Sequence, residues 1–234
     1  MTSADNTPII VGVGQINDRP DVPTDGMDPI ALMAAALVKA EGDAGAKLIA
    51  DADFLGIIQQ NAFRDLGDPC TPLAVALGAS PATAYQSDGP NGDSPILLLN
   101  EAANRIGAGE VKIALVVGAE ALRTATARAK VAAAAKGAAP VEATRAAAQR
   151  HQPNFAQSYG LVAPVDVYPL YENALRAHLG QSFAEAQQES GEIWSRFSDV
   201  AAANDGAWIK KPTSAQAVIT PSDNNRPIAF PYNK

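Results

Sequence analysis

The pattern of hydrophobic positions changes near residue 122. Before that point, continuous apolar runs alternate with segments of helical spacing. These runs are residues 8–15 (PIIVGVGQ), 52–59 (ADFLGIIQ), 82–87 (ATAYQS) and 112–121 (KIALVVGAEA). Continuously apolar runs are typical of strands that are covered on both faces. Residues 1–122 are therefore expected to form a layered α/β core with four strands.

Three amphipathic or apolar segments between these runs predict helices. Residues 28–40 begin with an Asp cap and a Pro, and residues 71–78 end at a Gly. The third, residues 94–106, has apolar side chains in every direction, so we expect it to be the most buried helix. Its apolar residues are Ile96, Leu97, Leu98, Leu99, Ala102, Ala103 and Ile106.

Residues 123–234 have a different composition and form the second expected unit, a helical domain with an irregular tail. Residues 123–150 are rich in alanine and predict a lightly packed surface helix broken at 137–140, or a linker. Apolar stripes predict a helical subdomain over 150–205, whereas the Pro- and Asn-rich tail 221–234 predicts no regular element. The stripes and aromatic residues expected in this subdomain's core are Tyr171, Leu175, Leu179, Ile193, Trp194, Phe197, Val200 and Trp208.

Composition and charge disfavour two classes of function. The chain has 234 residues, 47% of them hydrophobic, and a net charge of −7 without a run of like charges. This balance disfavours a general nucleic-acid binder and a protein that binds anionic membranes. The N-terminus is polar before it is apolar, and the apolar runs are too short to span a bilayer, so we expect a cytoplasmic protein.

Few residues are candidates for catalysis or metal binding. One cysteine, Cys70, and two histidines, His151 and His178, disfavour a disulfide framework and a metal site. Cys70 precedes a helix start, but no histidine is near it in sequence, which favours a structural or exposed cysteine over a nucleophile. The glycines of GVGQ at 12–15 lack the third glycine of a dinucleotide fingerprint, so close packing explains them better.

Several segments together resemble the N-terminal half of the thiolase superfamily, most closely the thiolase-like acetyl-CoA acetyltransferases of the sterol-carrier-protein type. The segments are 8–15, 102–122 (AANRIGAGEVKIALVVGAEAL), 168–180 (YPLYENALRAHLG) and 197–232, which ends in NRPIAFPY. The resemblance implies a layered α/β/α half with a mostly helical loop-domain excursion. It also implies an acyltransferase of lipid metabolism whose ligand is a coenzyme A thioester, with no covalently bound cofactor.

The resemblance directs attention to the turn at 87–94 (SDGPNGDS). In active thiolases this turn carries the nucleophilic cysteine at the start of a buried helix. Counting back from Ile106 places Gly92 at that position, and a slip of one residue places Asn91 or Asp93 there. The alternative interpretation is a helix capped by Asp93 or Ser94. The resemblance thus implies no catalytic residue in the turn, and substrate-binding roles for Ser87, Asp88, Asn91, Gly92 and Ser94.

The resemblance also implies partners, because family members have a second half that supplies the catalytic histidine. Thiolysis by this chain alone is therefore not expected. The expected partners are a second copy across the strand at 82–87, or a separate chain that supplies the C-terminal half. Two functions stay open: an acyl-CoA-handling protein without its nucleophile, and a non-catalytic CoA-binding or assembly subunit of a multi-chain acyl-CoA or lipid-degrading complex. A nucleotide-binding domain is disfavoured.

Overall fold

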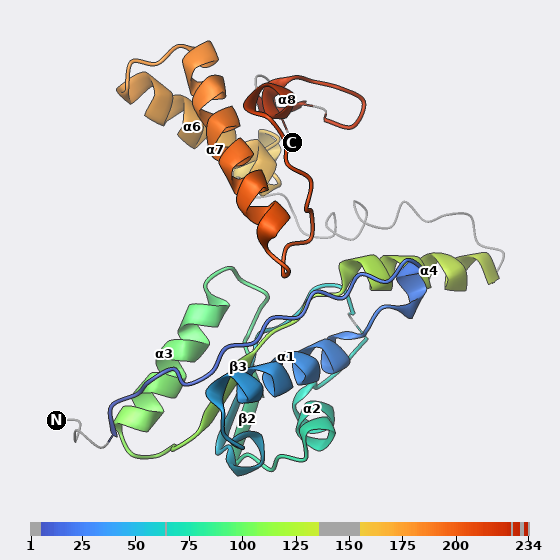
Figure 1. The fold of residues 1–234 in the computed structure, drawn as a ribbon, viewed down its shortest axis with the longest axis vertical. Coiled ribbons are helices and arrows are strands. Elements are labelled where there is room, and N and C mark those ends of the chain that lie inside the picture. Colours follow the sequence, from blue (N-terminus) through green and yellow to red (C-terminus); the bar gives the residue numbers. More distant parts are fainter. Residues whose placement is uncertain (1–5, 64, 136–154, 226, 230–231, 234) are drawn as a thin grey trace. The chain divides into compact units, whose positions relative to one another are not determined.

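The computed structural model describes residues 6–63, 65–135, 155–225, 227–229 and 232–233 (Figure 1). Contacts within the chain divide it into two compact units, Met1–Pro140 and Val141–Lys234. Each unit is described by itself.

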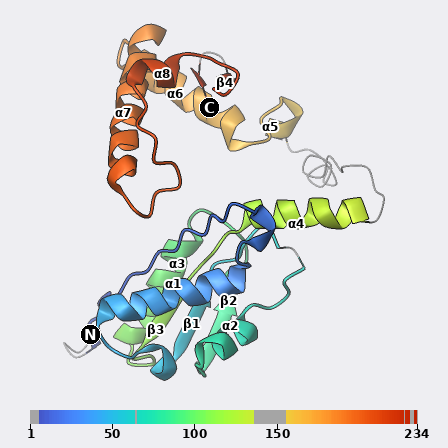
Figure 2. The same cartoon turned by 45° about the vertical axis from the view of Figure 1, so that its right-hand side comes forward.

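The first unit is built on a parallel sheet of β1 (Phe54–Ile57), β2 (Thr83–Gln86) and β3 (Ala114–Val117). The strand order is β2-β1-β3, and β1 pairs with both neighbours over its whole length (Figure 2). The predicted strands at 52–59, 82–87 and 112–121 are confirmed. Because the strands are parallel, their carboxyl ends all lie at one edge of the sheet.

The prediction of a fourth strand at residues 8–15 is wrong. The segment joins no ladder among the described residues, and Ile10 and Val13 are 76% and 66% exposed. It instead lies along α1 (Pro29–Ala44), where the backbone N–H of Val13 donates to Asp43. A Cβ on Gly12 or Gly14 would collide with backbone carbonyl oxygens of α1, so the two glycines do allow close packing, against a helix.

Helices cover both faces of the sheet. On one face, α1 and α2 (Cys70–Leu77) enclose a core with the side chains of Leu55 and Ile57 from β1. On the other face, α3 (Ser94–Gly107) packs against Phe54. Alternate residues of β1 point to opposite faces, so a strand with no polar side chain is buried throughout.

Helix α3 is not the most buried helix, contrary to expectation. Leu98 and Ala102 are buried against the sheet, but Ile96 and Leu97 are 60% and 57% exposed. An isolated α-helix on a sheet buries only the side that faces the sheet. The apolar residues on its other side are left uncovered by the described residues.

Helix α4 (Leu122–Ala135) occupies part of the alanine-rich segment and is tied to the short 3-10 helix η2 (Pro23–Asp25) and its flanking residues. Arg123 donates to the carbonyl oxygen of Pro20, and Arg128 donates to those of Thr24 and Gly26. These contacts anchor a helix whose alanine side chains offer little area to bury. The expected break at 137–140 lies outside the described residues.

The second unit is mostly helical, as expected. It contains α5 (Phe155–Ser158), α6 (Pro164–His178), α7 (Phe183–Ala203) and α8 (Ala215–Ile219). Ser182 and Glu185 form a capping box at the start of α7. The tail was expected to be irregular, but it forms a two-stranded antiparallel ladder of β4 (Pro227–Ala229) and β5 (Tyr232–Asn233), because backbone pairing needs no apolar pattern.

The core predicted for this second unit from its aromatic residues is wrong. Tyr171, Trp194 and Phe197 are 65%, 60% and 57% exposed. Among the described residues of α5 to α8, only Ala186 and Gly191 are buried. A stripe of apolar side chains indicates a surface that is stable when buried, but it does not identify the surface that packs against it. Among the described residues, no helix is long and apolar enough to cross a membrane.

One carboxylate in the first unit gives a prediction about acid stability. Glu41 of α1 accepts hydrogen bonds from the backbone N–H groups of Ile49 and Leu48. It also forms an ion pair with Lys47. The bond from Ile49 contributes most to lowering the pKa of Glu41, from 4.5 to about 2.

A group whose pKa is lowered by folding stabilises the native state above its unfolded pKa and loses that contribution as the pH falls. The contribution of Glu41 should therefore be present above about pH 4.5 and disappear toward pH 2. We expect Glu41→Gln to lower the denaturation midpoint at pH 7 and to flatten its dependence on pH in this window. Urea denaturation at several pH values measures this; parallel profiles for the two proteins would contradict it.

Candidate functional site

The loops that follow the three parallel strands meet at the carboxyl edge of the sheet. The loop after β1 is linked to the loop after β2, because the N–H of Gln59 donates to Ser87 Oγ and the N–H of Ser87 donates to the carbonyl oxygen of Ile57. The loop after β1 is also linked to β3, because the N–H of Ile58 donates to the carbonyl oxygen of Val117. Open α/β sheets bind ligands at this edge.

Glu120 holds the loop after β1 from the side of β3. Its carboxylate accepts hydrogen bonds from the backbone N–H groups of Asn61, Ala62 and Ala121. The same loop approaches Gly118 so closely that a Cβ there would lie 2.9 Å from the Cβ of Ile58. The Gly-x-Glu pattern at 118–120 therefore has a structural role, in which Glu120 positions the loop.

The turn 87–94 is organised around one carbonyl group. The hydroxyls of Ser87 and Ser94 both donate to the carbonyl oxygen of Gly89, each at 3.0 Å. Ser94 is 2% exposed. Two of the five residues to which the resemblance gives substrate-binding roles therefore fix the shape of the turn. The side chains of Asp88 and Asn91 are exposed and form no hydrogen bond with a described residue, while the carbonyl oxygen of Asn91 accepts a hydrogen bond from the N–H of Ser94.

The start of α3 has no side-chain cap, so the alternative interpretation of a capped helix is wrong. Asp93 occupies the N-cap position without a side-chain hydrogen bond, and Ser94 donates to Gly89 instead of accepting from the helix. The N–H groups of Gly92 and Asp93 have no acceptor among the described residues. Such free donors at a helix start favour a negatively charged or polarised oxygen.

Gly92 lies in open space. It is exposed, its φ is not positive, and a Cβ added to it would meet no atom within 4 Å. The backbone therefore accepts a side chain at the position that the resemblance aligns with a nucleophile. The absence of a side chain there is a property of the sequence, and the fold does not impose it.

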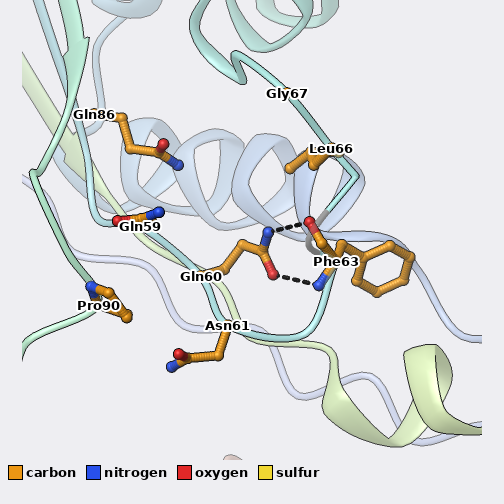
Figure 3. A pocket seen from close by; sticks show the side chains of 8 residues that line it. All are labelled: Gln59, Gln60, Asn61, Phe63, Leu66, Gly67, Gln86 and Pro90. Atoms are coloured by element: carbon orange, nitrogen blue, oxygen red, sulfur yellow. Dashed lines mark hydrogen bonds between the residues drawn. The ribbon is translucent and has the colours of Figure 1, made fainter. Parts of the chain in front are cut away.

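A cavity of about 310 Å³ lies between the loops after β1 and β2. Figure 3 shows that its walls come from the ends of both strands and from the loop at 59–67. The described residues of its lining are uncharged and rich in side-chain amides: Gln59, Gln60, Asn61, Phe63, Leu66, Gly67, Gln86 and Pro90. This is the size of a small ligand-binding pocket.

Sequence reasoning missed these amides. The signal that would have found them is the change from the buried strand FLGI to the polar QQN directly after it. Polar residues that follow a buried parallel strand lie at the edge where ligands bind. They belong to no named motif, so motif patterns do not point to them.

Cys70 lies away from this cavity's lining, in the core beside α1 and β1. It is 8% exposed. Burial, and then the hydrogen bond and negative charge of Asp68, raise the pKa of the thiol to about 11. A protonated thiol is a poor nucleophile, so Cys70 has a structural role.

The remaining candidates do not join the site. His178 is the exposed last residue of α6 in the second unit, and His151 lies outside the described residues. No group of three or more potential metal ligands occurs in the part of the chain that the structure describes.

The environment of Cys70 predicts its reactivity. We expect it to react slowly with a thiol reagent at pH 8 in the native protein, because a pKa near 11 leaves little thiolate. Asp68→Asn removes the carboxylate that contributes to the raised pKa and should increase the rate severalfold. Asp65→Asn, an exposed neighbour, is the matched control. Reaction of wild-type Cys70 at the rate of the denatured chain would contradict this assignment.

Comparisons with known proteins place this geometry in a wider context. Neither the protein-family models nor the curated proteins give a match to the sequence. Among solved structures, a monomeric SCP2-thiolase-like protein of type 1 from Mycobacterium smegmatis is 28% identical, with a TM-score of 0.71 over 98% of this chain. An Ltp2-ChsH2(DUF35) aldolase is 18% identical, with a TM-score of 0.65 over 95% of this chain.

The chain spans 42% of the first of these structures and 50% of the second. Both likenesses extend over nearly all of this chain. The mixed architecture with its parallel sheet and many helices agrees with them. The chain therefore has a thiolase-like fold of the SCP2 type.

Proposed function

We propose that this chain is a thiolase-like acyl-CoA-handling protein, of the acetyl-CoA acetyltransferase kind, in which the nucleophilic cysteine is absent. The observation that carries the proposal is Gly92, which stands in open space at the uncapped start of α3. The turn that contains it leaves the carboxyl end of β2, beside the cavity. A coenzyme A thioester is the proposed ligand, with its thioester end at this turn.

The chemistry open to such a site follows from the missing thiol. A thiolase-type acyl-enzyme needs a covalent nucleophile, so thiolysis through this turn is not expected. Free N–H groups at a helix start would still stabilise a polarised thioester oxygen. A reaction without a covalent intermediate, such as retro-aldol cleavage with a general base from elsewhere, is compatible with this arrangement. One structural neighbour is named as an aldolase.

A second candidate function is a non-catalytic CoA-binding or assembly subunit of a multi-chain acyl-CoA or lipid-degrading complex. The name of the Ltp2-ChsH2(DUF35) aldolase joins two components, which makes a partner chain plausible here. The exposed apolar side of α3 and the exposed aromatic residues of α7 favour this candidate. The partner would be a second copy of this chain or a separate chain that supplies the C-terminal half.

The edges of the sheet are available for such a partner. In the described sheet, β2 and β3 each pair only with β1, so both have an unpaired edge. Unpaired edges and exposed apolar patches are normally covered in stable proteins. The edge at β2 is the surface at which the resemblance implies a second copy.

Placing a thiol in the turn tests the proposed ligand. We expect Gly92→Cys to be alkylated at pH 7 about tenfold faster than Ala108→Cys, a control at the other end of the same helix. A helix N-terminus lowers a thiol pKa, and one unit of pKa is a tenfold change in thiolate. Acetoacetyl-CoA should slow the alkylation of Gly92→Cys and leave that of Ala108→Cys unchanged.

Two results would refute the proposed site. Equal alkylation rates for the two variants would show that the turn does not act as a helix start that stabilises an anion. An alkylation rate of Gly92→Cys that millimolar acetoacetyl-CoA does not change would show that the thioester does not bind there. Mass spectrometry locates the label and separates it from any reaction at Cys70.

The exposed side of α3 gives a prediction about assembly. We expect light scattering at micromolar concentration to show a dimer, a larger assembly or aggregation. Leu97→Glu should reduce this association, because it places a charge in the exposed apolar surface. Asn104→Glu, on the exposed C-terminal part of the same helix, is the control. A stable monomer of 24.2 kDa in the wild-type chain would contradict the proposed assembly.

A further inference from the structure

We propose that the first unit binds an extended, apolar segment of a partner chain as an additional strand between β3 and residues 8–15. This strand would pair with the free edge of β3 on one side and with residues 8–15 on the other. The space between these two borders is called the strand slot below. The inference goes beyond the proposed ligand and does not depend on it. It gives the partner chain of the second candidate function a surface and a chemistry.

The first argument is that residues 8–15 follow β3 without pairing with it. Before β3, a Cβ added to Gly109 would lie 2.9 Å from Nδ2 of Asn6. After β3, Arg123 donates a hydrogen bond to the carbonyl oxygen of Pro20. The same number of residues separates the two contacts in both segments, so the segments run in the same direction over the same length of chain. Residues 8–15 nevertheless join no ladder among the described residues.

The second argument is that β3 has the sequence of an interior strand but lies at the edge of the described sheet. Its sequence ALVV is apolar on both faces, which is typical of strands that lie inside a covered parallel sheet. Three of its four residues are nevertheless half-buried, whereas β1 is buried throughout. By contrast, β2 at the opposite edge has a polar residue at each end. An absent neighbour beside β3 accounts for this difference.

The backbone groups at the free edge of β3 indicate what can bind there. The carbonyl oxygens of Ile113 and Val117 accept hydrogen bonds from the side of β1. Alternate residues of a strand direct their backbone groups to the same side, so those of Ala114 and Val116 point away from β1. They have no backbone partner among the described residues. Such a row of unpaired donors and acceptors is a template for another strand.

Residues 8–15, which run beside α1 in both views (Figures 1 and 2), present a second such edge. On one side, the N–H of Val13 donates to Asp43, and the carbonyl oxygen of Gln15 accepts from Lys39. Asp43 and Lys39 are exposed on α1, whose buried residues face the sheet, so this is the side away from the sheet. The backbone groups of the alternate residues point toward the sheet, without a backbone partner among the described residues.

The third argument concerns the side chains of the partner strand. Neither border of the strand slot carries a charge, because residues 9–14 are IIVGVG and β3 is ALVV. Leu115 of β3 packs into the core on the side of α1, and Val116 packs into the core on the side of α3. A strand beside β3 would lie between the same two layers of helices. It therefore needs small or β-branched apolar side chains on both faces.

Hydrogen exchange of backbone amides in the full chain, measured by NMR, tests the strand slot. The probe is a peptide of about six valine, isoleucine and glycine residues, the usual length of a strand, with a lysine at each end for solubility. The control peptide has the same sequence with N-methyl groups on alternate residues, which removes the N–H donors along one edge. A strand that pairs on both sides needs both of its edges. The amides of Ala84 and Gln86, at the free edge of β2, are the internal control.

In the free chain, we expect the amides of Ile10, Ala114 and Val116 to exchange rapidly, because they have no hydrogen-bond acceptor. The unmethylated peptide should slow the exchange of all three amides at least about tenfold and leave Ala84 and Gln86 unchanged. The methylated peptide should bind about tenfold more weakly, because it cannot form the hydrogen bonds along one edge.

Gly14→Ala tests whether residues 8–15 form the second border. A Cβ at this position would collide with the carbonyl oxygen of Ala36, so the segment would have to move from its place on α1. We expect this variant to bind the peptide at least about fivefold more weakly than the wild type. Gly42→Ala is the matched control, because a Cβ there meets no atom within 4 Å. Thermal melting confirms that each variant is folded.

Several results would overturn the inference. Slow exchange of Ala114 and Val116 in the free chain would show that this edge is already paired, and protection that grows with protein concentration would assign it to a second copy. The absence of protection at millimolar peptide would show that no strand binds there. Equal binding of both peptides, or wild-type affinity of Gly14→Ala, would show that the strand does not pair on both sides. None of these results bears on the binding of acetoacetyl-CoA at Gly92, which the alkylation experiment measures separately.

Discussion

The pairing of β1 on both sides is the constraint on which the first unit depends. Phe54, Leu55 and Ile57 have no exposed surface, and the strand is bonded to β2 along one edge and to β3 along the other. The chain moves one step across the sheet from β1 to β2 and then two steps back to β3. Crossovers between parallel strands are right-handed. The two connections run in opposite directions across the sheet, so their helices, α2 between β1 and β2 and α3 between β2 and β3, lie on opposite faces. The layered architecture thus follows from the strand order.

The same constraint positions the candidate site. Three parallel strands bring three loops to one edge, and side-chain bonds from Ser87 and Glu120 fix the middle loop to the other two. The site is therefore a gap between loops that are bonded to one another, next to a helix start with an exposed glycine. The described lining of the cavity contributes side-chain amides, and the helix start contributes backbone N–H groups. Such groups bind and orient a ligand through hydrogen bonds.

The sequence predicted most elements of the first unit because their signals are local. Asp28 accepts a hydrogen bond at the start of α1, and Gly78 adopts a positive φ at the end of α2, as their positions indicated. The segment at 8–15 was misassigned because the same apolar pattern suits a strand and an extended chain packed on a helix. Pairing depends on a neighbour that the local pattern does not specify.

The exposed side of α3 and the aromatic residues of α7 were misassigned for a related reason. An apolar pattern indicates that a surface needs cover, but its cover can belong to another chain. In the site, the turn 87–94 was found from the resemblance, whereas Gln59 and Gln86 were not found. Their place in the cavity wall depends on how the loops after β1 and β2 meet in three dimensions, which the local sequence does not specify.

The contacts of Arg123 and Arg128 with the carbonyl groups near η2 join positions more than a hundred residues apart in the chain. Such contacts bring the last helix of the first unit back to its beginning, so the chain between them forms a closed loop. A backbone nick in the exposed part of the loop after β1 would leave two pieces that still share one sheet and this arginine link. The first unit is therefore suited to reconstitution from two complementary fragments, in which one supplies β1 and the other supplies the strands on either side of it.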